Sequence, residues 1–134
     1  MRYFIDANII LDIWLKRPQF FENSLQIFKN IEERNWLLYT SDNVITTCYY
    51  MISKKINREE SKRLIADFLV DLEIVPVSKQ MLLNATISKI SDYEDAVQFE
   101  CAASIKGING IITRNKKDFK HSTIPVFAPE EVLF

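Results

Sequence analysis

Three aspartates, far apart in the sequence, lie where their carboxylates could do chemistry together. Asp6 ends the apolar run Tyr3–Ile5, Asp95 lies near the start of a helical stretch, and Asp118 follows the apolar pair Ile111–Ile112 by a few residues. If the apolar runs are strands of one α/β sheet, the three carboxylates can meet at one edge of that sheet. A hydrolase that uses divalent metal ions needs such an arrangement, because hard cations prefer carboxylate oxygens.

Asp6 and Asp118 also have ordinary structural explanations. Asp6 could cap a helix that begins near Asn8, since aspartate is a good helix cap. Asp118 could belong to a solvated turn, because charged residues surround it. Neither acid would indicate a site alone, and the prediction of a site depends on their joint placement with Asp95.

The surroundings of Asp95 predict a helix cap and something more. Ser91 and Glu94 have the S-x-x-E spacing of a capping box, which predicts Ser91 as the cap of the following helix. Capping and the helix dipole explain Asp95 less well, because it lies in line with Phe99 and Ala102 on an apolar helix face. A carboxylate directed toward a core is costly unless it is paired or bound to a metal.

The composition is that of an ordinary globular chain and excludes several kinds of site. The 134 residues are 48% hydrophobic and 26% charged, which fits one domain with a substantial core. The 17 basic and 18 acidic side chains give a net charge of −1, so charge alone does not indicate a nucleic-acid binder. There is no glycine-rich phosphate-binding loop. His121, the only histidine, has no nucleophile motif around it, which argues against a histidine-based triad.

The sequence also predicts the compartment. No signal peptide is visible, and no apolar run approaches the roughly 20 residues of a membrane span. Cys48 and Cys101 lack C-x-x-C spacing and are expected to be reduced thiols in the core. We therefore expect a cytoplasmic protein without membrane contact.

Five short apolar runs are predicted to be strands, with helices between them. The predicted strands are Arg2–Asp6, Trp36–Ser41, Glu73–Val77, Gly110–Thr113 and Pro125–Ala128. The predicted helices are Asn8–Leu15, Phe21–Arg34, Asn43–Lys55, Arg58–Leu72, Ser78–Ile90 and Asp92–Lys106. Continuous apolarity in the strands favours parallel strands covered on both faces. The alternation predicts an α/β fold, a three-layer sandwich with a central, mainly parallel sheet.

Three segments carry a family resemblance. They are FIDANIILD at residues 4–12, DYEDAVQ at 92–98 and IITRNKKDF at 111–119. In order, spacing and setting they resemble the PIN-domain family of metal-dependent ribonucleases, which includes the VapC-type toxins, over nearly the whole chain. The resemblance implies a single PIN-like domain of residues 1–134 that hydrolyses RNA phosphodiester bonds. It also implies that Asp6, Asp95 and an acid of the 113–118 segment, Asp118, bind Mg²⁺ or Mn²⁺.

Three positions depart from the family pattern. The Glu that members usually carry in the helix after the second strand falls on Thr47, or on the neighbouring Thr46. Asn115 occupies a position that varies between Asp and Asn, and Ala7 stands where many members have Thr or Ser. Neutral side chains add no negative charge, so weaker metal binding is expected, with one ion instead of two. The open alternative is a non-catalytic, RNA-binding PIN domain with a decayed metal site.

Polar and basic side chains beside the acids complete the predicted site. The predicted catalytic residues are Asp6, Asp95, Asp118 and Asn115. The residues predicted to bind substrate are Asn8, Thr47, Thr113, Arg114, Lys116 and Lys117. The basic residues among these would contact phosphates, which positions RNA without reading its sequence; a solvated loop is the alternative. The resemblance further implies an antitoxin protein as partner and a homodimer.

Overall fold

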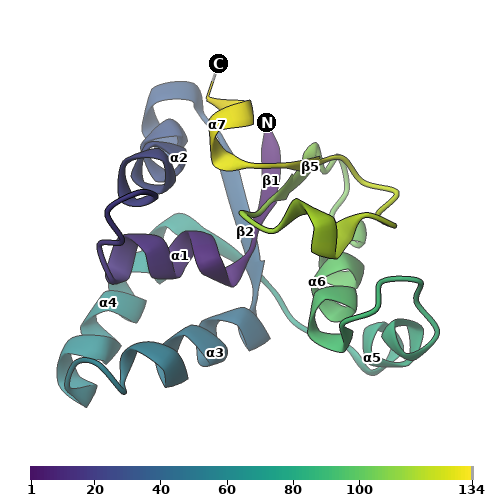
Figure 1. The fold of residues 1–134 in the computed structure, drawn as a ribbon, viewed down its shortest axis with the longest axis horizontal. Coiled ribbons are helices and arrows are strands. Elements are labelled where there is room, and N and C mark those ends of the chain that lie inside the picture. The colour runs from purple at the N-terminus through teal and green to yellow at the C-terminus, as the bar shows by residue number, and fades with distance from the viewer. Residues whose placement is uncertain (134) are drawn as a thin grey trace.

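The computed structural model describes residues 1–133, which form a parallel five-stranded sheet between two layers of helices (Figure 1). In spatial order the strands are β3 (Leu72–Val75), β2 (Leu37–Ser41), β1 (Arg2–Ile5), β4 (Gly110–Ile112) and β5 (Val126–Phe127). All four strand pairings are parallel. The predicted three-layer sandwich is confirmed, and its strands are shorter than predicted by one or more residues.

Helices connect the strands and cover both faces of the sheet. They are α1 (Ala7–Trp14), α2 (Phe21–Arg34), α3 (Asp42–Ile52), α4 (Arg58–Asp71), α5 (Lys79–Thr86), α6 (Tyr93–Ala103), α7 (Pro129–Val132) and the 3₁₀ turn η1 (Lys116–Phe119). In residues 1–133 no helix is long and apolar enough to cross a membrane.

Alternate strand residues sort into two separate cores. Tyr3 and Ile5 of β1 pack with α1 to α4 on one face, while Phe4 packs with α5 and α6 on the other. This sorting follows from the two-residue period of a strand. Cys48 and Cys101 are free and buried, one in each core, as predicted.

Local capping signals decide where two of the helices begin. The Asn57 side chain accepts a hydrogen bond from Glu60 N at 2.8 Å and caps α4. The predicted capping box at Ser91 is wrong, because Asp92 caps α6 and its Oδ1 accepts from Asp95 N at 3.0 Å. Asp92 has the same three-residue spacing to a backbone donor and caps as well as serine does. The shift leaves Asp95 in the first turn of α6.

The parallel register brings the residues after β1 and β4 side by side. Ile5 pairs with Ile112, and Asp6 N donates to Ile112 O at 3.0 Å. Asp6 and Thr113 therefore follow directly at the same edge of the sheet. The carboxyl ends of parallel strands are where ligands bind in α/β folds.

Gly110 is needed where β5 approaches β4. A Cβ at this position would lie 2.6 Å from Phe127 Cε2 and 3.0 Å from Pro125 O. Gly110→Ala is therefore expected to lower the free energy of unfolding by about 1–3 kcal/mol, the usual cost of overpacking, as measured by urea denaturation. A second change, Phe127→Leu, should recover part of this loss. Unchanged stability of Gly110→Ala would contradict the close approach.

Candidate active site

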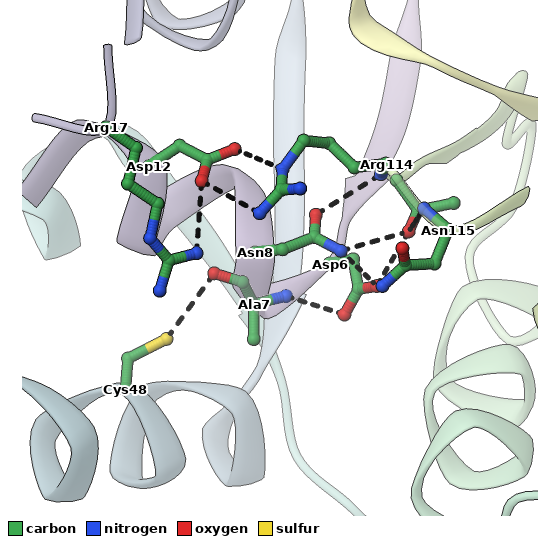
Figure 2. A network of polar contacts seen from close by, with 9 residues as sticks. Asp6, Ala7, Asn8, Asp12, Arg17, Cys48, Arg114 and Asn115 are labelled. Carbon is green, nitrogen blue, oxygen red and sulfur yellow. Dashed lines mark hydrogen bonds and ion pairs between the residues drawn. The ribbon is translucent and has the colours of Figure 1, made fainter. Parts of the chain in front are cut away.

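Three hydrogen-bond donors hold the Asp6 carboxylate at the edge of the sheet. The side chain is 7% exposed. Its Oδ1 accepts from Ala7 N at 2.7 Å, and its Oδ2 accepts from Thr113 Oγ1 at 2.8 Å and Asn8 Nδ2 at 3.2 Å (Figure 2). Asp6 thus caps α1, as the structural explanation predicted. The same bonds fix the orientation of its carboxylate.

The environment of Asp6 balances burial against hydrogen bonding. Burial raises the pKa of the Asp6 carboxyl group, and the charge of Asp118 adds to this effect. Hydrogen bonds from Thr113, Ala7 and Gln98 lower the pKa because they favour the ionised form. Gln98 is buried in α6, and its Oε1 has no partner within residues 1–133. Gln98 lies in one of the motif segments, but its role as a support for Asp6 was not predicted.

Asp95 comes from the opposite layer, in the first turn of α6. Burial raises its pKa to about 7, and the charges of Asp6, Asp92, Asp118 and Glu94 contribute. No residue in the described part of the chain pairs its charge with Asp95 or donates to its carboxylate. Asp95 is thus a half-buried acid without a compensating cation, as its place on the helix suggested.

Asp118 contributes charge from the exposed turn η1. Its negative charge raises the pKa of both Asp6 and Asp95. Within residues 1–133, however, no three His, Cys, Asp or Glu side chains lie close enough together to hold a metal ion. The three aspartates therefore influence one another's charge, but they do not surround a position where a metal ion could contact all three.

The carboxylates of this site fit a metal ion held by two acids and several waters, but not one enclosed by three acids. Mg²⁺ is commonly held by one or two carboxylates and keeps several waters. Asp6 and Asp95 suit this mode, because a divalent cation would relieve their repulsion. An ion enclosed by three protein acids does not fit the side chains as they lie.

A second ionic cluster beside the site was not predicted. Asp12 is fully buried in α1. Its Oδ2 accepts from Arg114 Nε at 2.6 Å, and its Oδ1 accepts from Arg114 Nη2 at 3.1 Å and Arg17 Nη1 at 3.2 Å (Figure 2). The Arg114 guanidinium also lies 3.9 Å from the centre of the Phe20 ring. One signal was available, since an acid inside an apolar helical run requires a buried partner.

Three of the residues predicted to bind substrate have partners inside the protein. Asn8 donates to Asp6 and Thr113, and its Oδ1 accepts from Arg114 N at 3.3 Å. Thr113 is buried and donates to Asp6. The Arg114 guanidinium is engaged by Asp12. These contacts give all three residues a structural role, and binding of substrate by them stays a prediction.

Most of the remaining predicted residues are exposed. Asn115 is exposed beside Asp6, and its N–H donates to Thr113 Oγ1 at 3.1 Å (Figure 2). Lys117 is exposed in η1, whereas Lys116 Nζ pairs with Glu131 Oε1 at 2.8 Å. Thr47 is half-buried in α3. Asn115 and Lys117 are therefore the predicted contacts with the most freedom to meet a ligand.

The fold agrees with a comparison against known families. Residues 2–117 match the PIN-domain family model. The chain belongs to the PIN-domain family. It is 31% identical to a protein named Ribonuclease VapC1 from Aquifex aeolicus (strain VF5), in an alignment that covers 97% of this chain and 92% of that protein.

Solved structures show the same fold. A VapBC2 complex from Rickettsia felis, bound to a DNA fragment from its promoter, matches with a TM-score of 0.70 at 21% identity, over 96% of this chain and 98% of that one. A toxin–antitoxin complex from Klebsiella pneumoniae matches with a TM-score of 0.69 at 22% identity, over 95% and 97%. At this identity the likeness concerns the fold.

The buried Asp12 makes a testable contribution to stability. Asp12→Ala is expected to lower the free energy of unfolding by about 3 kcal/mol, because it leaves two arginines without their buried partner. Urea denaturation measures the loss. The control is Glu60→Ala, which removes a pair with Arg63 whose side chains are 44% and 69% exposed; its effect should stay below about 1 kcal/mol. A similar loss of unfolding free energy in Asp12→Ala and Glu60→Ala would contradict the larger contribution of the buried pair.

Asp95 should make the stability of the metal-free protein depend on pH. A carboxyl group whose pKa is raised to about 7 in the folded state destabilises the fold progressively as pH rises from its unfolded pKa, about 4, to 7. Asp95→Asn removes this penalty, so its melting temperature should exceed that of the wild type by a margin that grows up to pH 7 and is then constant. Asp67→Asn, an exposed acid of α4, is the control. A margin independent of pH would contradict the raised pKa.

Proposed function

We propose that this protein is an endoribonuclease that hydrolyses RNA phosphodiester bonds with Mg²⁺ or Mn²⁺. The observation that carries the proposal is that Asp6, at the carboxyl edge of the sheet, repels the carboxylate of Asp95 in α6, and that neither acid forms an ion pair with a cation of the described residues. The name of the 31% identical relative, Ribonuclease VapC1, supports the same reaction and substrate class.

Each side chain of the site would have a separate role in the cleavage. Asp6 and Asp95 would hold the ion, which supplies positive charge to stabilise the phosphate as negative charge develops on it. Thr113 and Asn8 keep Asp6 oriented and favour its ionised form. Asp95 must give up a proton held with a pKa of about 7 before it can bind a cation, so metal binding should strengthen as pH rises toward that value.

The other predicted residues would act around this pair. Asp118 would act through water, because it does not lie close enough to complete a three-acid group within residues 1–133. Asn115 is exposed beside Asp6 and would hydrogen-bond the substrate or a water. Lys117, also exposed, would contact an RNA phosphate, while neutral Thr47 would contribute no charge.

The proposal includes a partner and a cellular setting. One solved structure of the same fold is a toxin–antitoxin complex, which supports a role for this chain as a toxin that an antitoxin protein inhibits. We infer in addition that the toxin acts in the cytoplasm as a homodimer. Co-purification with the product of a small neighbouring reading frame tests the partner. Failure to co-purify would count against the toxin role without affecting RNA cleavage.

Replacing one carboxylate should abolish the activity. The wild-type protein with Mn²⁺ is expected to cut single-stranded RNA, and Asp6→Asn should reduce cutting to background because the carboxylate charge is lost while the shape is kept. Gel electrophoresis of a labelled RNA measures the products. Asp67→Asn is the matched control and should cut like the wild type. Cutting by Asp6→Asn at the wild-type rate would overturn the assignment.

A non-catalytic RNA-binding role is the second candidate. Neutral Thr47 in place of the family Glu and the absence of a three-acid group in residues 1–133 favour it. Titration calorimetry separates the two candidates. Heat of Mg²⁺ or Mn²⁺ binding at millimolar concentration supports the nuclease, and no heat supports the decayed site.

A further inference from the structure

One groove of the molecule has no role in the proposed cleavage. Residues from the N-terminal halves of α3, α5 and α6 line it, together with Val77 before α5. Its apolar lining comes from Val77, Leu82 and Val97. The acids Asp42 and Glu94 and the aromatic ring of Tyr93 also line it. Tyr93 and Glu94 directly precede Asp95 in the first turn of α6. The groove therefore lies within one helical turn of Asp95.

Tyr93 offers an aromatic surface held in place by the protein. Its hydroxyl donates to Leu82 O at 3.0 Å, which ties the ring to α5. The residue is nevertheless 45% exposed, so packing between α5 and α6 does not use all of the ring. Fixed, exposed aromatic rings beside a nuclease site are suited to stacking on unpaired bases.

The charges in the groove decide what kind of base fits. Asp42 and Glu94 line it, and no lysine or arginine does, so the groove repels a phosphate group. Asp42 Oδ1 accepts from Asn43 N at 2.8 Å and Val77 N at 3.2 Å, which fixes the carboxylate. Asp42 Oδ2 and the Glu94 carboxylate accept no hydrogen bond from residues 1–133. The groove therefore presents free acceptors beside an aromatic ring.

Guanine is the base that complements this set. It alone carries two adjacent N–H donors on one edge, N1–H and the N2 amino group, and a carboxylate accepts two parallel donors. Uracil presents one N–H between two carbonyl oxygens, which carboxylates repel. We propose that the groove is a subsite for one unpaired guanine next to the scissile bond, with Tyr93 stacking on the base and Asp42 and Glu94 accepting its N–H groups. The inference rests on the proposed RNA cleavage and deepens it.

Binding of short RNAs without divalent ions tests the subsite. Fluorescence anisotropy in EDTA would compare labelled tetranucleotides UGUU, UUUU and UIUU, where inosine lacks the amino group of guanine. The wild type is expected to bind UGUU roughly tenfold more tightly than UUUU, as expected for one stacked and hydrogen-bonded base, with UIUU between them. Equal affinities, or no detectable binding of UGUU at millimolar concentration, would overturn the proposal.

Variants assign the preference to the groove. Tyr93→Ala should remove the preference for UGUU, while Tyr93→Phe keeps the ring and should retain it. Glu94→Gln should reduce it, because an amide repels one of the two donors. Tyr50→Ala, at a tyrosine of α3 that is 62% exposed, is the matched control and should change nothing. A preference that survives in Tyr93→Ala would overturn the role of the ring.

The two proposals fail in different ways. Because the binding assay contains no divalent ion, it does not depend on cleavage. Guanine-selective binding without cleavage in Mn²⁺ would overturn the proposed function and support the subsite. Cleavage in Mn²⁺ without guanine preference in either assay would overturn the subsite and support the nuclease.

Discussion

The hydrogen bond from Thr113 Oγ1 to Asp6 Oδ2, at 2.8 Å, is the contact on which the rest of the site depends. It joins the ends of β1 and β4, which are neighbours in the sheet although 107 residues separate the two side chains. The parallel register of Ile5 with Ile112 makes the contact possible. A slip of one residue would turn Asp6 toward the other face, and the carboxylate would no longer face α6.

The buried acids differ in whether an arginine neutralises their charge. Asp12 is neutralised by Arg114 and Arg17 and packs inside the protein as part of a closed cluster. Asp6 and Asp95 have no such partner among residues 1–133 and retain raised pKa values. Leaving two nearby carboxylates uncompensated is costly for the fold. That cost is understandable if a divalent cation completes the site, which is why this pair carries the proposed function.

Local patterns predicted most of the fold, and they failed where several local solutions compete. The apolar runs located all five strands, and Asn57 capped α4 as expected. Ser91 was a plausible cap for α6, but Asp92 satisfies the same rule one residue later and prevails. The partner of Asp12 could not be predicted, because Arg114 lies 102 residues away and no short-range pattern relates them.

The sequence by itself determined the strands, the places of helices α1 to α6 to within about four residues, and the identities of the candidate acids, because these depend on residues within a few positions of one another. Only the tertiary structure decided that Arg114 pairs with Asp12, that the pKa of Asp95 rises to about 7, and that Tyr93 lines a groove. Charge pairing and pKa values depend on distances through space and on burial. Those quantities exist only after the sheet has brought remote segments to one edge.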